Sequence, residues 1–301
     1  MPELPEVEVI RAGLAPAVIG ARIVAVDARD ARALTRHVGG PRDFEARLRG
    51  RAVTGVARRG KFLWLPVEPQ GDAAREAVLV HLGMSGQMLL RADGAPTERH
   101  ERIRLSVEHP EHGLLHVVFA DQRTFGSLAI DELVATADAE AAGWGATEPL
   151  LPIQVAHIAR DPLDPAFRDH AFVNALARKD SAIKRVLLDQ TVVSGIGNIY
   201  ADESLWAARI HPEASARSLS RRAAVRLLAE IRAVLKRALA EGGTSFDAQY
   251  VNVNGHAGYF ARRLHAYGRT GQPCPRCGRP IVRASFMNRS SHFCTRCQRV
   301  P

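Results

Sequence analysis

The chain has few cysteines and lysines, and it has no long apolar run. None of its 301 residues lies in an uncharged apolar stretch of the roughly 18–20 residues that a membrane-spanning helix requires. The opening, Met-Pro-Glu-Leu-Pro-Glu, is too acidic for a signal peptide. We therefore expect no membrane association and a cytoplasmic location, where the four cysteines are reduced thiolates or metal ligands rather than disulfides.

Positive charge exceeds negative charge. Lys and Arg together number 41 against 32 Asp and Glu, a formal net charge of +9. This excess favours a nucleic acid partner, with a basic but uninvolved surface as the alternative. Residues 269–301 hold seven arginines and no acidic residue. Only four residues are lysine, so each is a candidate for a role that guanidinium fills poorly: Lys61, Lys179, Lys184 and Lys236.

The length and the 46% hydrophobic content predict a globular protein of about two domains. A helix is expected from Pro5 to about Gly20, because Val7, Ile10 and Leu14 share one helical face. Short apolar runs between turn residues follow, a pattern typical of an antiparallel sandwich or barrel. These expected strands cover residues 23–26, 52–56, 62–67, 77–82, 88–90, 103–107 and 114–119.

The second part of the chain changes to a helical period. The stretch Gly143–Pro165 carries four prolines and is expected to be a linker. Beyond it, helices are expected at residues 172–176, 183–188, 200–208 and 220–240, the last with Ser220 as N-cap. The residues after Gly243 again indicate loops and strands.

The cysteines form two Cys-x2-Cys pairs, Cys274/Cys277 and Cys294/Cys297, separated by sixteen residues. The intervening residues are enough for a β-hairpin that brings the four thiolates to one point. This spacing predicts a closed, structural Zn²⁺ site, with an iron or redox site and disulfides as the alternatives. Because a closed site has no open position for chemistry, its expected role is to hold the arginine-rich hairpin for DNA contact.

The first residues are a possible reactive group. Removal of Met1 leaves the secondary amine of Pro2, and an α-amino group with a pKa well below that of lysine is a nucleophile near neutral pH. Glu3 and Glu6 stand beside it as acid–base groups, although both carboxylates equally suit the positive end of a helix.

Seven motifs, spread over essentially the whole chain, make it resemble the bacterial formamidopyrimidine-DNA glycosylases. They are Met1–Glu8 (MPELPEVE), Lys61-Phe62-Leu63, His81–Gly86, Asp121–Gly126, Gly195–Ala201, Gly258-Tyr259-Phe260, and the four-cysteine finger with Asn288-Arg289.

The resemblance implies an α+β multidomain fold. It consists of an N-terminal β-sandwich with a leading helix, a helix–two-turn–helix domain and a C-terminal zinc-finger β-hairpin. The implied division is 1–135 for the catalytic sandwich, 136–165 for a linker, 166–245 for the helical DNA-binding domain, and 246–301 for a lesion-recognition loop and the finger. The loop Tyr250–Gly258 is expected to contact the extruded base.

The resemblance also implies the chemistry. Pro2 attacks C1′ of the damaged nucleotide, and the resulting iminium drives β-elimination and then δ-elimination. Glu3 is the implied proton donor with Glu6 in support, and Lys61 serves β-elimination and phosphate binding, with a surface lysine as the alternative. Arg289 matches the arginine assigned to δ-elimination, although clamping a phosphate is the easier role for a guanidinium that holds its proton.

DNA-contacting residues follow from the same motifs. Met84, Arg123 and Phe125 match the residues that fill the gap left by an extruded base; without the resemblance, Met84 and Phe125 would be assigned to the core. Thr124 stands where other members often have a second arginine. The implied phosphate contacts, of which His100 has a structural alternative, are His81, His100, Lys179 and Asn198.

The implied function is a zinc-containing, monomeric DNA glycosylase with AP lyase activity in base excision repair. Its expected partner is double-stranded DNA containing oxidised purines (8-oxoguanine, formamidopyrimidines) or abasic sites, at the bacterial nucleoid. The alternatives are an endonuclease VIII-like enzyme for oxidised pyrimidines and a non-catalytic binder of damaged DNA. The presence of Pro2, Glu3 and Lys61 favours an enzyme over a binder.

Overall fold

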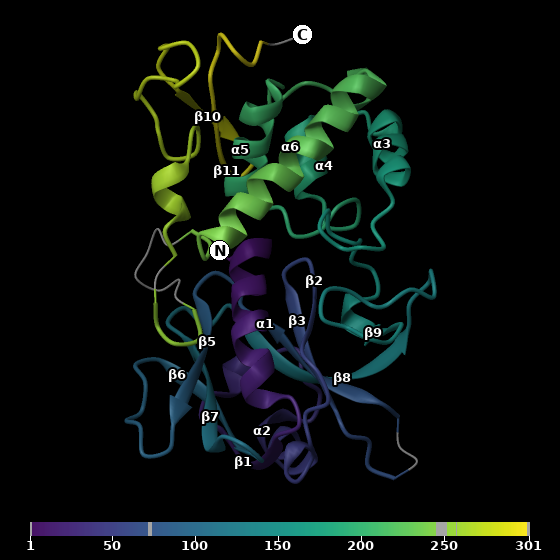
Figure 1. Ribbon diagram of the computed structural model, residues 1–301, viewed down its shortest axis with the longest axis vertical. Helices are drawn as coiled ribbons and strands as arrows, with labels where there is room; N and C mark the ends of the chain where they lie inside the picture. Colours follow the sequence, from purple (N-terminus) through teal and green to yellow (C-terminus); the bar gives the residue numbers. More distant parts are fainter. Residues whose placement is uncertain (1, 72–73, 245–251, 257, 300–301) are drawn as a thin grey trace. The chain divides into compact units, whose positions relative to one another are not determined.

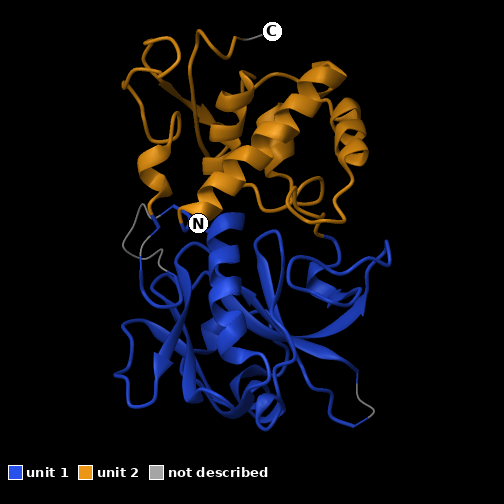
Figure 2. Cartoon of the chain, viewed as in Figure 1, with its two compact units in different colours: residues 1–157, 242–258 blue, residues 158–241, 259–301 orange. Residues whose placement is uncertain are grey.

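The structure, a computed structural model, describes residues 2–71, 74–244, 252–256 and 258–299 (Figure 1). The chain divides into two units, one made of residues 1–157 and 242–258 and the other of residues 158–241 and 259–301 (Figure 2). No helix in the described ranges is long and apolar enough to cross a membrane.

Helix α1, Leu4–Val18, opens the first unit with Pro5 in its first turn, as the sequence predicts. Val7, Ile10 and Leu14 are all buried on one face of α1, and they join the main hydrophobic core. The helix packs against β2 and β3 of one sheet and against β6 of the other. The core of the first unit is thus built from both sheets and this helix.

Two antiparallel sheets form the sandwich (Figure 1). The four-stranded sheet has the order β1 (Arg22–Ala28), β6 (Glu101–His109), β7 (Gly113–Asp121), β5 (Gly86–Ala92). The five-stranded sheet has the order β2 (Ala57–Arg59), β3 (Phe62–Val67), β4 (Glu76–His81), β8 (Ser127–Ala135), β9 (Leu150–Pro152). The sandwich alternative is therefore confirmed over the barrel.

The expected strand at residues 52–56 is wrong. Ala52 forms an isolated bridge with Arg22 of β1, and Val53 forms one with Val67 of β3. Because neighbouring residues pair with different sheets, the segment crosses between the sheets and extends neither ladder. The sequence patterns did not predict the 3-10 helix η1 (Ala31–Leu34), the helix α2 (Gly40–Leu48) or the strands β8 and β9. The proline-rich stretch 143–165 holds β9 and the 3-10 helix η2 (Ile153–Val155).

The second unit contains four α-helices in its described part: α3 (Asp169–Arg178), α4 (Ile183–Leu188), α5 (Asn198–Ala208) and α6 (Arg221–Ala240). Helix α5 packs against α4, α6 and the finger strand β11, and α3 packs against α6. Ser220 caps α6 by accepting a hydrogen bond from the Ala223 amide at 3.2 Å, as predicted. Two 3-10 helices, η3 (Ala216–Ser218) and η4 (Phe260–Arg263), complete the unit.

The C-terminal hairpin consists of β10 (Val282–Phe286) and β11 (Arg289–Phe293), paired antiparallel. Behind it, Trp206 of α5, Ala266, Ile281 and two of the cysteines form a small separate core. The predicted α+β class, with sandwich, helical domain and finger hairpin, is confirmed.

Candidate functional site

Pro2 is buried directly before α1, and Glu3, the N-cap residue of α1, is 2% exposed. One oxygen of the Glu6 carboxylate accepts a hydrogen bond from the Glu3 amide at 2.9 Å. The other oxygen accepts from the amide and the hydroxyl of Thr244 at 2.7 and 2.9 Å. Gly243 has a φ of +83°, a conformation that favours glycine, and a Cβ there would lie 2.9 Å from this second oxygen. Glu6 therefore positions the start of α1 and the Glu3 backbone.

Lys61 occupies the two-residue turn between β2 and β3, where Gly60 has a φ of +58°. The Arg58 guanidinium, which is 1% exposed, donates to the Gly60 carbonyl at 3.1 Å and to Glu8 Oε2 at 2.9 Å. Because Glu8 lies on α1, this buried bridge ties the turn that carries Lys61 to the N-terminal helix.

His81 ends β4, and its ring packs against the Phe62 ring with 4.8 Å between centroids and 44° between the ring planes. Burial lowers the pKa of His81 to about 4, and the charges of Arg36 and Lys61 act in the same direction. Its Nδ1 accepts a hydrogen bond from the Gly83 amide at 3.2 Å, so the proton of the neutral ring is on Nε2. His81 is thus a neutral hydrogen-bond donor.

Arg36 is a basic residue that the sequence analysis missed. Its exposed guanidinium lies 5.7 Å from the centroid of the Phe62 ring, the same ring that packs against His81. Gln154 Nε2 donates to its backbone carbonyl at 3.3 Å. The cations Arg36 and Lys61 therefore lie beside the neutral His81 on one edge, and nothing in an arginine-rich sequence singles Arg36 out.

Met84, Arg123 and Phe125 come from two loops that pack against each other. Met84 is 39% exposed and Phe125 is 55% exposed, so neither is a core residue. The Arg123 guanidinium lies 4.8 Å from the centroid of the Phe125 ring. The result is a projecting group of two apolar side chains and one cation.

A fully buried carboxylate, that of Asp121, holds these two loops. It accepts hydrogen bonds from the amides of Arg123 and Gly126 at 3.1 and 2.8 Å and from the Ser85 hydroxyl at 2.5 Å. Gly83 has a φ of +60°, and a Cβ there would lie 2.4 Å from the Phe125 carbonyl carbon. Asp121 and Gly83 are therefore positioning residues for the projecting group. Both lie in motifs identified in the sequence, but no role was predicted for either.

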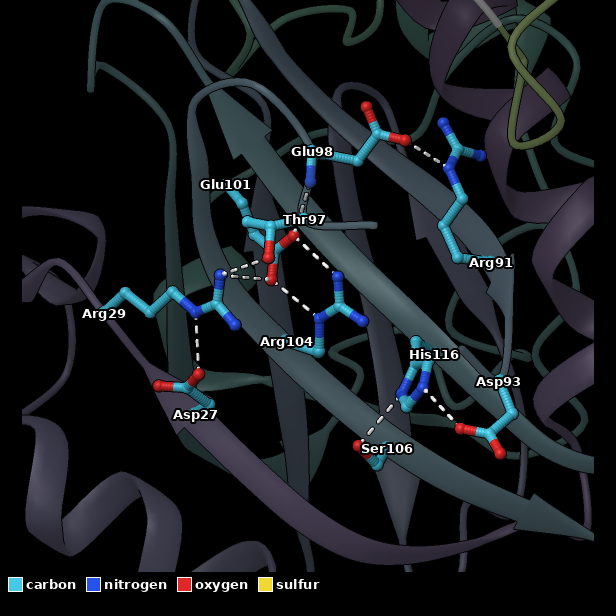
Figure 3. Close-up of polar contacts among 10 residues, drawn as sticks. All are labelled: Asp27, Arg29, Arg91, Asp93, Thr97, Glu98, Glu101, Arg104, Ser106 and His116. Carbon is cyan, nitrogen blue, oxygen red and sulfur yellow. Dashed lines mark hydrogen bonds and ion pairs between the residues drawn. The ribbon is translucent and has the colours of Figure 1, made fainter. Parts of the chain in front are cut away.

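His100 ends the connection between β5 and β6 in a left-handed conformation, with a φ of +63°. Its carbonyl accepts a hydrogen bond from the Asp121 amide at 2.9 Å. An ion pair between Arg91 and Glu98 spans the same connection (Figure 3). The imidazole is thus carried on a fixed backbone.

The neighbouring Glu101 anchors that connection to the four-stranded sheet (Figure 3). Its carboxylate is buried and pairs with Arg104 at 2.7 Å and with Arg29 at 3.2 Å, and it accepts a hydrogen bond from the Glu98 amide at 3.0 Å. Burial acts to raise the pKa of Glu101, but the hydrogen bonds from Arg104 and Glu98 outweigh it and hold that pKa below its ordinary value. The carboxylate therefore stays charged and paired.

In the second unit, Lys179 and Arg289 line one pocket of about 640 Å³. Lys179 follows α3, and its Nζ lies 3.6 Å from Asp189 Oδ2, while Arg289 begins β11. The pocket thus joins two residues that the motifs placed far apart in the sequence. The lining also contains the cation Arg185 and the apolar Met287, neither of which the sequence analysis identified.

Asn198 is the first residue of α5, after the turn that contains Gly195 and Gly197. The Gln190 side chain brackets this turn, because its Oε1 accepts from the Gly195 amide and its Nε2 donates to the Ile196 carbonyl, both at 2.9 Å. The Asn198 Oδ1 atom is buried and has no hydrogen-bond partner among the described residues. Gln190 is a positioning residue that no motif indicated.

The four cysteine sulfurs lie within 4.8 Å of one another. Tetrahedral Zn–S bonds of about 2.3 Å place the sulfurs about 3.8 Å apart, which this cluster fits. The Cys274 carbonyl accepts hydrogen bonds from the amides of Cys277 and Gly278 at 3.2 and 2.8 Å, which folds the first knuckle. The predicted Zn²⁺ site is confirmed, and a metal held by four thiolates there supplies folding energy rather than catalysis.

Buried charges on α4 and α5 hold the finger hairpin. The fully buried Lys184 Nζ lies 2.6 Å from Asp202 Oδ1 and donates to the Ser290 carbonyl at 2.8 Å. The other Asp202 oxygen accepts from the His292 amide at 2.8 Å. The strand that carries Arg289 is thus fixed to two helices.

Three family models match the chain. They are the formamidopyrimidine-DNA glycosylase N-terminal domain over residues 1–128, the H2TH domain of the same family over residues 158–249, and the zinc finger found in FPG and IleRS over residues 271–300. Together they match most of the chain. The chain belongs to the formamidopyrimidine-DNA glycosylase family. The resemblance seen in the sequence is therefore confirmed.

Relatives and solved structures of the glycosylase family agree over the full length. The formamidopyrimidine-DNA glycosylases of Leifsonia xyli and Thermobifida fusca are 64% and 52% identical to the chain; the matches cover 100% of the chain and 100% and 98% of the relatives. The Thermus thermophilus protein is 35% identical, with a TM-score of 0.80 and full coverage of both chains. The Lactococcus lactis Fpg bound to DNA with an abasic site is 30% identical, with a TM-score of 0.78 and 99% coverage of each chain.

The motif residues of the glycosylase family fall into groups. In the first unit, one group is Pro2, Glu3 and Glu6, a second is Lys61 and His81, and a third is Met84, Arg123 and Phe125. In the second unit, Lys179 and Arg289 share a pocket, whereas Asn198 belongs to a separate turn. Met1 and residues 250, 251 and 257 of the expected lesion-recognition loop lie outside the described residues.

Proposed function

We propose that the chain excises oxidised purines from double-stranded DNA and then cleaves the strand at the abasic site, in base excision repair. The observation that carries this proposal is the N-terminus, where buried Pro2 precedes a Glu3 held in place by Glu6. The names of the relatives and the complexes of the Lactococcus lactis Fpg with abasic-site and Fapy-dG DNA support this substrate class.

Pro2 is the proposed nucleophile. After removal of Met1, the lone pair of its nitrogen attacks C1′, and the glycosidic bond breaks with its electrons going to the base. Glu3 supplies the proton that the departing base takes up. The Pro2 nitrogen then loses its proton and the C1′–O4′ bond breaks with its electrons going to O4′, which takes up a proton, so that an iminium joins Pro2 to the opened sugar. The iminium acidifies C2′; loss of that proton expels the 3′-phosphate, and a second elimination expels the 5′-phosphate. Glu6, which already accepts three hydrogen bonds, positions Glu3 and transfers no proton.

The basic residues bind the phosphates next to the lesion. Lys61 assists β-elimination, His81 donates from Nε2, and Arg289 clamps the phosphate that leaves in δ-elimination. His100, Lys179 and Asn198 are further proposed phosphate contacts. Met84, Arg123 and Phe125 fill the space from which the base is extruded, which their exposure on packed loops supports.

The functional division proposed for the chain is a catalytic sandwich at 1–135, a linker at 136–165, a helical DNA-binding domain at 166–245, and the lesion-recognition loop with the finger at 246–301. The matches to the three family models support it. We further propose that the protein acts as a cytoplasmic monomer at the nucleoid.

Covalent trapping tests this function. Borohydride reduces an iminium, so the native protein should become linked to duplex DNA containing 8-oxoguanine. A variant with one residue retained ahead of Pro2 has an amide nitrogen without an available lone pair, and it should form no adduct while still binding abasic-site DNA. Glu3→Gln should lose base excision but keep some cleavage of a preformed abasic site. Equal trapping of the native and extended forms would overturn the role of Pro2.

A further inference from the structure

A second pocket of the second unit, of about 570 Å³, lies at the zinc knuckles. Its lining consists only of cysteines and arginines: Arg209, Arg276, Cys277, Arg296, Cys297 and Arg299. No described carboxylate lines it. Glu230 of α6 acts electrostatically on Arg276 from outside the lining.

Two of these arginines have local structural roles. The Arg276 guanidinium donates to the carbonyls of Trp206 and Ala207 at 2.7 and 3.0 Å and lies 3.7 Å from the Trp206 ring centroid. Arg209 ends α5 in a left-handed conformation, where a cation suits the negative end of the helix. They form fixed positive walls of the pocket.

Arg296 and Arg299 have no such local structural role. Both are exposed, and neither makes an ion pair or a side-chain hydrogen bond with the described part of the chain. Neutralising the metal site does not account for them, because Zn²⁺ with four thiolates carries a net charge of about −2, while the four guanidinium groups carry four positive charges. Even with the Glu230 carboxylate counted, the described part of this region keeps an excess of positive charge.

We propose that this pocket, the knuckle pocket, binds backbone phosphates of DNA at a second site, separate from the pocket of Lys179 and Arg289. Guanidinium groups bind phosphate in bidentate geometry. The lining offers no apolar side chain to recognise a peptide, so it fits a polyanion bound without regard to sequence. The choice of DNA as that polyanion rests on the proposed function.

The position of the knuckle pocket makes it a separate site. Arg289 lies near the turn of the hairpin, whereas Cys297 and Arg299 follow its other end. A five-residue strand spans about 17 Å, more than one phosphate can bridge. The DNA held there is either a distant part of the damaged duplex or a second duplex.

The test compares zinc-loaded wild-type protein with Arg296→Gln/Arg299→Gln. The control is Arg221→Gln/Arg222→Gln, which removes the same charge from exposed positions on α6. Binding is measured on duplexes of about 12 and about 36 base pairs with a central abasic-site analogue, roughly 40 and 120 Å long. If the distant part of the same duplex is bound, the knuckle variant loses about threefold to tenfold affinity on the long duplex alone, and its salt slope falls by about 1.8.

If a second duplex is bound, protein saturated with the short damaged duplex takes up a labelled undamaged duplex, and the knuckle variant does not. Arg296→Lys/Arg299→Lys should retain part of the binding, because the charge is kept while the bidentate geometry of the guanidinium groups is lost. The proposal fails if the knuckle variant behaves like the Arg221→Gln/Arg222→Gln control both in binding the long duplex and in taking up a second duplex. If that variant then also releases zinc faster to a chelator, the arginines serve only to offset the charge of the thiolates. The uptake of undamaged DNA is a binding measurement that needs no strand cleavage. Failure of this proposal can therefore be told apart from failure of the proposed glycosylase function.

Discussion

His81 keeps its ring neutral in the folded protein because it is buried beside two cations, and this links stability to pH. Its pKa is about 4 when folded and 6.5 in an ordinary environment. Between these values the unfolded chain binds a proton that the folded chain does not, so stability is full above about pH 6.5 and falls as pH drops toward 4.

We therefore expect the free energy of unfolding to fall between pH 7 and pH 5 by less in His81→Gln than in the wild type, with a difference of about 2 kcal/mol. Urea denaturation at the two pH values measures it. Burial also lowers the pKa values of His37 and His211, and comparison with the variant cancels their contribution. A difference between the two proteins that stays constant with pH would contradict the burial argument.

Arg32 and Arg36 are both exposed, but their side chains have different partners. Arg32 forms an ion pair with Asp30 at 2.8 Å, whereas Arg36 extends over the Phe62 ring beside His81. Arg36→Gln should weaken DNA binding and reduce the salt slope by about 0.9, the value for one lost phosphate contact. Arg32→Gln should change neither. Fluorescence anisotropy over a salt series measures both, and equal slopes for the two variants would remove Arg36 from the DNA-binding edge.

At the level of elements, the helix α5 organises the second unit through two adjacent carboxylates. Asp202 accepts from the His292 amide and pairs with Lys184, and Glu203 accepts from the amides of His265, Ala266 and Tyr267 at 2.8 to 3.1 Å. The finger is therefore attached to α5 by buried charge as well as by its own metal site.

Loss of the Lys184 amine should leave the buried Asp202 carboxylate without its lysine partner, with the His292 amide and ring nitrogen as its remaining described partners. We expect Lys184→Met to cost about 3–5 kcal/mol of unfolding free energy. Lys236→Met, at an exposed position of α6, should cost less than about 0.5 kcal/mol. Urea denaturation compares the two variants, and similar losses would show that the buried pair contributes nothing specific.

Sequence patterns predicted elements with strong apolar spacing and missed those without it. Helix α4 matched its expected bounds, Ile183–Leu188, because four of its six residues are buried. Helix α2 buries only Phe44 and Leu48, and the sequence Gly39-Gly40-Pro41 at its start is typical of a turn, so its helical period is weak. The run at 52–56 has the composition of a strand, and only tertiary pairing shows that it passes between sheets.

The candidate site divides in the same way. The motifs predicted the exposed loop residues, such as Met84 and Phe125, because the family resemblance implies which residues contact DNA. Residues that act by holding others, such as Asp121, Gln190 and Arg58, show their role only when their hydrogen-bond partners are known. Spacing alone predicted the cysteine site, because each Cys-x2-Cys turn brings its two thiolates together whatever the rest of the fold.

At the scale of the whole molecule, the segment 242–258 belongs to the first unit although the second unit precedes and follows it. Val253 is 2% exposed in the sandwich core, and its carbonyl accepts a hydrogen bond from the Leu90 amide at 2.8 Å. Val253→Ala should cost about 1–3 kcal/mol, whereas Val225→Ala, which is 52% exposed on α6, should cost little. Urea denaturation measures both; equal costs would mean that Val253 is not part of that core.

This insertion also governs how the molecule can be cut. The backbone passes between the units three times, after residues 157, 241 and 258, and the amide of Tyr259 donates to the Glu241 carbonyl at 2.9 Å where the excursion closes. A protease that nicks the chain once, near residue 157, leaves two covalent strands joining the halves. A gene fragment that stops at residue 157 encodes a sandwich with a hole opposite Gly13, where Val253 would sit. The first unit is therefore discontinuous in sequence, and its core is complete only when a segment from beyond residue 241 is present.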